Sequence, residues 1–303
     1  MLQKYIIILL VLIVSCKEQN KKILPKKVNS EIIKTSQFEL IKVDKQNGLL
    51  ILFPCFPCDI ENTKNEFNIA EISVKNGISI LYMNLNRRLY LEEAEKQNLA
   101  ELLTQTIRKE KIPENNIYIG GFSGGGNVSL LISDYLMKSE NKIQPKGVFI
   151  VDSPIDLLAL YRVSEKNLKL NFSESSIQES NWIKTEFDSI FGNPSDGIEK
   201  YEKNAPYTFE SENIDNLTGL KGLKIRFYTE PDIDWWKEEK NNDYIDLNAF
   251  YLKKLSEKLK LEFGNNNIEL IETQNKGYRA NGDRHPHSWS IVNKKDLIKW
   301  MLE

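Results

Sequence analysis

Residues 117–130 of this 303-residue chain read Ile-Tyr-Ile-Gly-Gly-Phe-Ser-Gly-Gly-Gly-Asn-Val-Ser-Leu. The β-branched and aromatic residues at the start of this stretch predict a buried strand, and the apolar residues from Val128 onward predict a helix. Ser123 lies between the two predicted elements, with Gly121 two residues before it and Gly125 two residues after it. The stretch therefore predicts a strand, a sharp turn that carries a serine, and a helix.

The two glycines have a specific physical use beside such a serine. A serine on a sharp turn from strand to helix normally adopts a positive φ, and the residues two positions before and after it approach each other closely. Gly121 and Gly125 carry no Cβ that would clash there. The hydroxyl is then exposed above the sheet, at the positive end of a helix. We interpret Ser123 as a candidate nucleophile, while an ordinary glycine-rich turn is the alternative.

Length, charge and motif spacing narrow the classes of function. The length fits one large domain or two small ones, and a formal net charge of −2 argues against a nucleic-acid partner. No Gly-Lys-Ser/Thr follows the glycines, so a phosphate-binding loop is not indicated. We expect no cofactor. The two histidines, His285 and His287, also lack the spacing of a helical pair of metal ligands, so we expect no metal.

The N-terminus predicts export. Lys4 precedes an apolar run over residues 5–14, which is too short to span a bilayer and fits the hydrophobic region of a signal peptide. Residues 13–16, Ile-Val-Ser-Cys, resemble the lipobox of bacterial lipoproteins, which implies cleavage before Cys16 and lipidation of that cysteine. An uncleaved anchor and a plain signal peptide are the alternatives. Acyl chains on Cys16 would hold the protein at a membrane, facing the periplasm or the cell exterior.

We therefore expect a signal peptide over 1–15, a flexible polar tether over 16–34 and a folded domain over 35–303. Within the domain, Cys55 and Cys58 are the remaining cysteines. Export implies an oxidising compartment, which permits a local disulfide without requiring one, and we expect a structural role for the pair. The pair lacks the sequence context of a thioredoxin-like redox site, and two thiols alone make a poor zinc site.

Buried strands and amphipathic helices alternate along the folded domain, which predicts a parallel sheet with helices on both faces. The expected strands cover 39–43, 49–53, 78–83, 117–119, 147–151, 224–229 and 268–271, and the expected helices cover 59–70, 92–111, 129–138, 247–261 and 294–302. Asn47-Gly48 is a dipeptide typical of hairpin turns. Residues 154–221 contain many aromatic residues and no convincing strand, so we expect a helical lid there, with surface padding as the alternative.

Functional residues of a parallel sheet lie just after its strands, where ligands bind. The chain offers only His285 and His287 as a histidine base, both after the last predicted strand. We favour His287, because it comes just before the closing helix.

Several carboxylates follow strands and are candidates for the acid that orients the histidine. Asp232 and Asp234 follow the strand over 224–229 and are our preferred candidates, with Glu230 as a weaker one. The alternative is that one of these carboxylates caps the next helix. Asp152, after the strand over 147–151, is a further candidate.

The order serine, acid, histidine, each after a strand, resembles the α/β-hydrolase family over about residues 35–303. The motifs that carry the resemblance are Gly-Phe-Ser-Gly-Gly over 121–125, the acidic loop after 224–229 and His-Ser-Trp over 287–289. The resemblance implies a mostly parallel central sheet of about eight strands. It also implies an oxyanion hole in which the N–H of Gly124 is joined by that of Cys55 or Phe56. Here the sequence departs from many members, which carry His-Gly in that loop.

Two classes of function follow. The first is a lipid-anchored serine hydrolase that cleaves a carboxylic ester of a small-molecule acyl substrate, with peptidase and acyltransferase as nearby activities. The second is a surface lipoprotein on the same fold that binds a ligand or partner without catalysis. Arg162, Arg279 and Arg284 are also candidates for binding a substrate carboxylate. A surface ion pair with Asp283 or Glu165 is the alternative, and we favour it.

Overall fold

The computed structural model describes residues 29–85, 88–140, 142–264 and 266–303. Its centre is one eight-stranded sheet with the strand order β1-β2-β4-β3-β5-β6-β7-β8. The strands are β1 (Ser30–Lys34), β2 (Phe38–Val43), β3 (Gly48–Phe53), β4 (Ile78–Met83), β5 (Ile117–Phe122), β6 (Gly147–Val151), β7 (Lys224–Thr229) and β8 (Ile268–Glu272). The pairs from β4 to β8 are parallel, and β2 is antiparallel to both β1 and β4. The predicted fold class, with about eight mostly parallel strands, is confirmed.

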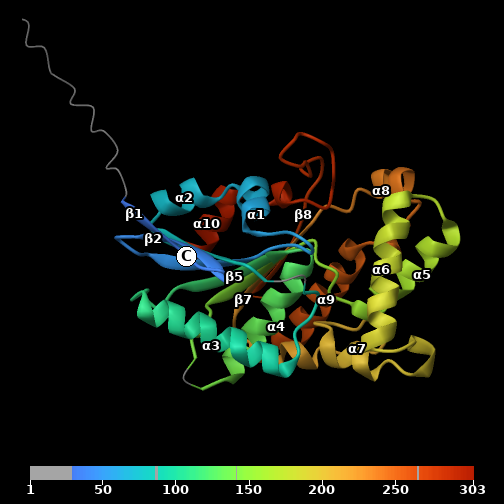
Figure 1. Cartoon of the computed structure of the whole chain (residues 1–303), viewed down its shortest axis with the longest axis horizontal. Helices are drawn as coiled ribbons and strands as arrows, with labels where there is room; N and C mark the ends of the chain where they lie inside the picture. Colours follow the sequence, from blue (N-terminus) through green and yellow to red (C-terminus); the bar gives the residue numbers. More distant parts are fainter. Residues whose placement is uncertain (1–28, 86–87, 141, 265) are drawn as a thin grey trace, which may run out of the picture.

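Helices cover both faces of the sheet, as Figure 1 shows. One face carries α1 (Ile60–Phe67), α2 (Ala70–Lys75) and α10 (Lys294–Leu302), and the other carries α3 (Glu93–Lys109), α4 (Gly124–Lys138) and α9 (Asn248–Phe263). Successive side chains of β3 point to opposite faces of the sheet: Leu50 packs in the core that contains α10, and Ile51 in the core that contains α3 and α4. This double burial explains why the parallel strands are apolar throughout rather than alternating.

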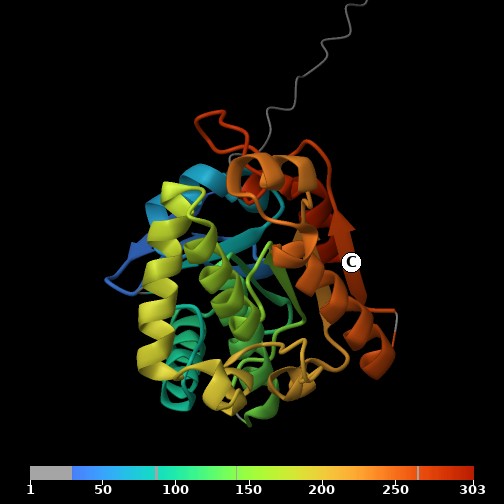
Figure 2. The same ribbon diagram turned by 90° about the vertical axis from the view of Figure 1, so that its right-hand side faces the viewer.

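The segment between β6 and β7 is helical, as the sequence predicts. It contains α5 (Leu157–Leu170), α6 (Glu174–Ile190), α7 (Glu199–Asn204) and the 3₁₀ turns η1 (Pro194–Asp196) and η2 (Asp215–Leu220). Its only β pairing within the described residues is an isolated bridge between Thr208 and Asn213. In Figure 2, α6 (yellow) runs along the left side of the molecule, and the short helix α8 (Ile233–Lys240, orange) lies at the top of the view.

The structure corrects two expectations near the N-terminus. Residues 30–34, expected within the tether, form β1 and pair with β2. Asn47-Gly48 is not the turn of a hairpin, because β4 lies between β2 and β3 in the sheet. The expected signal peptide, the lipidated Cys16 and the tether up to residue 28 fall outside the described residues. No helix in the described part of the chain is long and apolar enough to cross a membrane.

Candidate active site

Ser123 lies on the sharp turn between β5 and α4. Its φ of 53° and ψ of −128° fall in a backbone region that residues other than glycine rarely adopt, so the turn is strained. The turn is held by hydrogen bonds from the Ser123 N–H to the Val151 carbonyl and from the Gly126 N–H to the Ser123 carbonyl, both 2.9 Å. A Cβ added to Gly121 would overlap the Gly125 carbonyl. The predicted close approach of these two glycines is thus confirmed.

His287 lies beside this turn and is paired with Asp152. Its Nδ1 is 2.6 Å from Asp152 Oδ2, and its side chain is 19% exposed against 7% for the carboxylate. The imidazole also packs on Phe122, the residue before Ser123, with 4.5 Å between the ring centroids. The structure therefore brings together the loop after β8, the end of β5 and the end of β6.

Asp152 is held in place by its neighbours on β7 and α9. Thr229 donates its hydroxyl to Asp152 Oδ1 at 2.6 Å, and Asn248 donates its side-chain N–H to the Asp152 carbonyl at 2.9 Å. The backbone of Asp152 has a φ of 44°, and its N–H donates to the Tyr228 carbonyl. Sequence reasoning missed Thr229 and Asn248. For Thr229, the available sequence signal was its place as the last residue of the strand expected over 224–229.

The structure corrects the expectation that Asp232 or Asp234 lies behind His287. Asp232 caps α8 by accepting the Trp235 N–H at 3.2 Å, and its other oxygen accepts from Arg284. Asp234 lies in the first turn of α8 and is exposed. The alternative of a helix-capping carboxylate is therefore confirmed for Asp232.

Glu230 is a buried organiser of the loop that leads to the histidines. Its side chain is 1% exposed and accepts from the Thr273 hydroxyl at 2.8 Å and from the N–H groups of Lys276 at 2.8 Å and Gly277 at 3.1 Å. It also forms an ion pair with Arg284 at 2.6 Å. The carboxylate thus fixes residues 273–284 against the end of β7 rather than orienting an imidazole.

His285 occupies a different environment from His287. It packs against Trp235, with ring centroids 4.9 Å apart, and its Nδ1 has no hydrogen-bond partner among the described residues. Burial lowers the pKa of His285 to about 3, and the nearby His287 and Arg279 act in the same direction. His285 is therefore neutral at ordinary pH and is not joined to a described carboxylate.

The loop after β3 lies against the N-terminus of α4. Phe56 Cβ is 3.5 Å from the point where a Cβ on Gly124 would lie, and a Cβ on Gly125 would overlap the Pro54 carbonyl. Cys55 and Cys58 form a disulfide, and the Cys58 N–H donates to the Cys55 carbonyl at 2.8 Å. The loop carrying Cys55 and Phe56 therefore adjoins Gly124. Their assignment as oxyanion donors stays a prediction.

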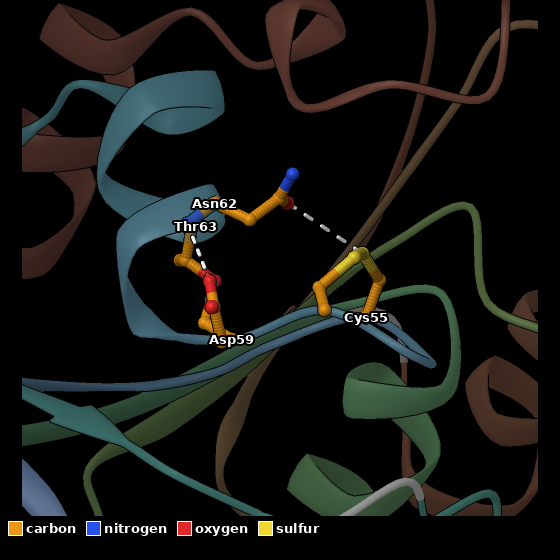
Figure 3. Close-up of a disulfide and its surroundings, with 5 residues drawn as sticks. Cys55, Asp59, Asn62 and Thr63 are labelled. Carbon is orange, nitrogen blue, oxygen red and sulfur yellow. Dashed lines mark hydrogen bonds between the residues drawn. A yellow bond between two sulfur atoms is a disulfide. The ribbon is translucent and has the colours of Figure 1, made fainter.

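The disulfide is next to the start of α1. Asp59 caps this helix by accepting the Asn62 N–H at 2.8 Å, and Figure 3 shows the Asn62 side chain directed toward Cys55. On the other side of the loop, Phe56 stacks on Trp182 of α6 with 4.3 Å between ring centroids. The segment 154–221 therefore reaches the carboxyl end of β3. Within the described ranges, no cluster of three or more histidine, cysteine or acidic side chains is arranged to hold a metal.

Comparisons with known proteins support the fold. No protein-family model and no curated protein matches the chain. An esterase/lipase from an uncultured bacterium superposes with a TM-score of 0.55 at 12% identity, over 91% of this chain and 86% of that chain. Carboxyl esterase 2 from the fungus Tuber melanosporum has a TM-score of 0.55 at 12% identity, over 91% and 85%. An esterase of the bacterial hormone-sensitive lipase family has a TM-score of 0.55 at 13% identity, over 92% and 84%. The chain has the α/β-hydrolase fold of these structures.

Proposed function

We propose that this protein is a serine hydrolase that cleaves carboxylic esters through an acyl-enzyme. The observation that carries the proposal is the His287–Asp152 pair next to the strained turn of Ser123. A strained nucleophile turn and a carboxylate-bound imidazole at one edge of a parallel sheet match the arrangement required for acyl transfer. The esterase descriptions of the similar structures agree with this chemistry.

In the proposed mechanism, Ser123 Oγ attacks the ester carbonyl and His287 Nε2 takes the hydroxyl proton. Asp152 accepts from Nδ1, which fixes the tautomer that leaves Nε2 free as a base and stabilises the imidazolium that forms. His287 then returns the proton to the leaving alcohol. A water molecule, activated in the same way, releases the acid from Ser123. Each step uses the imidazole in the orientation set by Asp152 and Thr229.

The oxyanion of the tetrahedral intermediate is proposed to lie against the N-terminus of α4. The Gly124 N–H makes no hydrogen bond to a described backbone carbonyl, and the positive end of the helix dipole favours negative charge there. The second donor is proposed to be the N–H of Cys55 or Phe56, because Pro54 and Pro57 have none. The disulfide and the stacking of Phe56 on Trp182 position this loop, and α6 is proposed to act as part of a lid.

Labelling with a fluorophosphonate probe tests the proposal, because the probe reacts only with an activated serine. We expect labelling of the purified protein that Ser123→Ala abolishes. Ser139→Ala, at the exposed end of α4, serves as the matched control and should label like the parent chain. A folded parent protein that shows no Ser123-dependent labelling would contradict the proposal.

One observation favours the alternative of a ligand-binding protein without catalysis. Within the described ranges, Ser123 Oγ makes no hydrogen bond to His287. Catalytic hydrogen bonds in ligand-free sites are often long, and they tighten when substrate binds. The labelling experiment separates the two, since a binding protein with an unactivated Ser123 does not react.

The cellular site is part of the same proposal: an exported lipoprotein anchored through Cys16. The sequence of residues 5–16 supports it, and the Cys55–Cys58 disulfide fits an oxidising compartment. Metabolic labelling with a radioactive fatty acid tests the anchor. We expect label in the membrane fraction for the parent chain and none for Cys16→Ala. Label that persists in the variant would contradict the lipidation site.

A further inference from the structure

Arg279 lies in the loop between β8 and His287 and approaches the site from the histidine side. Its guanidinium carbon is 5.8 Å from the centroid of the Phe122 ring, which His287 also contacts at 4.5 Å. Phe122 directly precedes Ser123. Arg279 therefore shares one aromatic ring with the base of the proposed mechanism.

Arg279 is partly buried and has no ion-pair partner within 4.0 Å among the described carboxylates. Burial lowers the pKa of Arg279, and Glu66 is the carboxylate whose charge opposes this effect. Glu66 forms no ion pair with the guanidinium within 4.0 Å; its Oε2 instead accepts the N–H of Ala280, the residue that follows Arg279, at 3.0 Å. The other two candidate arginines are neutralised: Arg284 by Glu230 and Asp232, and Arg162 by Glu210.

The loop that carries Arg279 is fixed from both ends. Glu230 accepts from the Gly277 N–H at 3.1 Å, and the Arg279 N–H donates to the Asp283 carbonyl at 2.9 Å. A charge removed from water without a partner is costly, so a guanidinium held in this way is suited to an anion that arrives with a ligand. Because the backbone is already ordered, binding an anion loses little additional conformational entropy.

A second cation strengthens the positive field at this side of the site. Lys240, at the end of α8, has Nζ 3.3 Å from the Ser173 hydroxyl and contacts Ser175, and no described carboxylate pairs with it. Both Lys240 and Arg279 act on the pKa of His285 in the lowering direction. His285 is therefore near two cations, Arg279 with an aromatic neighbour and Lys240 with hydroxyl neighbours.

The position of Arg279 also indicates which half of an ester it meets. In the mechanism proposed above, His287 delivers its proton to the leaving oxygen, so the alcohol half of the ester lies on the histidine side. We propose, on the basis of that function, that the protein prefers esters whose alcohol half carries a carboxylate, and that Arg279 binds this carboxylate.

A pair of acetyl esters with the same shape tests the proposal: 4-acetoxybenzoate, which is anionic, and 4-acetoxybenzamide, which is neutral. The parent chain should show a higher kcat/KM for the benzoate. In Arg279→Gln, the ratio of the two kcat/KM values should fall about 10- to 100-fold, the range expected for charge-assisted hydrogen bonds. Arg279→Lys should give an intermediate ratio, because lysine keeps the charge without the planar fork. Arg162→Gln, at a surface ion pair, is the matched control and should leave the ratio unchanged.

A second ester pair locates the charge. For 4-nitrophenyl butyrate and the mono-4-nitrophenyl ester of succinic acid, which carries its charge in the acyl half, the ratio should not depend on Arg279. The inference is overturned if Arg279→Gln leaves the benzoate-to-benzamide ratio of kcat/KM unchanged. It is also overturned if the substitution changes only the ratio for the succinate and butyrate esters. Turnover of the neutral benzamide ester that depends on Ser123 shows that the proposed function stands in either case. Absence of Ser123-dependent turnover for all four esters overturns the proposed function and the inference with it.

Discussion

The acidic residues that follow β6 and β7 pair with different kinds of side chain, an imidazole after β6 and a guanidinium after β7. Asp152 follows β6 and is bound to His287, while Glu230 and Asp232 follow β7 and are bound to Arg284. The two strands are neighbours and parallel, so these carboxylates lie at the same end of the sheet, after the carboxyl ends of the strands. An imidazole is a common general acid and base in catalysis, whereas a guanidinium stays protonated and gives a permanent ion pair.

The partner of a buried carboxylate, rather than its position at the end of a strand, therefore determines whether it orients an imidazole or fixes a loop. The Asp152 side chain reaches His287 because β6 lies directly beside β5, which ends just before Ser123. The residues after β7 lie one strand farther away, where they fix the loop over 273–284 and cap α8. The two groups are separable by mutation.

The largest expected effect is that of Asp152→Asn on catalysis. The amide keeps the size of the side chain but stabilises the wrong tautomer and cannot stabilise the imidazolium, so kcat for a short-chain ester should fall about 10³- to 10⁴-fold. Asp232→Asn is the matched control and should change kcat less than about threefold, because Asp232 does not contact His287. Steady-state kinetics with 4-nitrophenyl acetate measure both. A larger loss in Asp232→Asn than in Asp152→Asn would reverse the comparison.

Much of the fold could be predicted because its signals are local. Parallel strands such as β4 and β6 are short apolar runs that no solvent-exposed face interrupts, and α3 and α10 have clear amphipathic patterns. β1 was assigned to the tether because its residues are mostly exposed and its pairing with β2 depends on tertiary contact. The dipeptide Asn47-Gly48 was misleading for the same reason, since β4 comes between the strands it joins.

The candidate site could be predicted in part. The glycine spacing predicts the strained turn at Ser123, which the structure has. The carboxylate that contacts His287 is Asp152 rather than the preferred Asp232, because sequence alone does not reveal that Arg284 comes within reach of Asp232. Asp152, by contrast, follows its strand without an intervening residue, whereas a proline stands before Asp232. The choice between them depends on contacts across more than fifty residues of sequence, which no local pattern encodes.

The second expected effect is a loss of stability in Glu230→Gln. The amide removes the charge that pairs with Arg284. Its NH₂ group also replaces an oxygen that accepts from the N–H of Lys276 or Gly277, so two donors face each other. Breaking a buried, hydrogen-bonded ion pair costs about 3 kcal/mol. Urea unfolding should show this loss for Glu230→Gln and at most about 1 kcal/mol for Glu269→Gln, whose exposed carboxylate pairs with Arg226. Equal losses would mean that Glu230 does not organise the loop.

The third effect concerns pH. The pKa of His285 is about 3 in the folded protein against 6.5 for the free side chain, because of burial and nearby positive charge. Below pH 6.5 the unfolded chain therefore binds more protons at this position than the folded one, so the stability contribution of His285 falls as the pH drops from 6.5 toward 3. The urea midpoint of the parent chain should thus decrease more between pH 7.5 and 5 than that of His285→Phe. Parallel pH profiles would show that His285 is protonated as readily in the folded state as in the unfolded one.

The smallest expected effect is that of Asp232→Ala on stability, and it separates the two roles of this side chain. Alanine removes the acceptor for the Trp235 N–H at the start of α8, which typically costs about 1 kcal/mol. Arg284 keeps its pairing with Glu230, so the loop stays attached. Asp232→Asn retains the cap and loses only the charge, and its urea midpoint should therefore lie closer to that of the parent chain than the midpoint of Asp232→Ala does. If the two variants are equally destabilised, the ion pair with Arg284 rather than the cap is the main contribution of Asp232, and the β7 acids act as one unit.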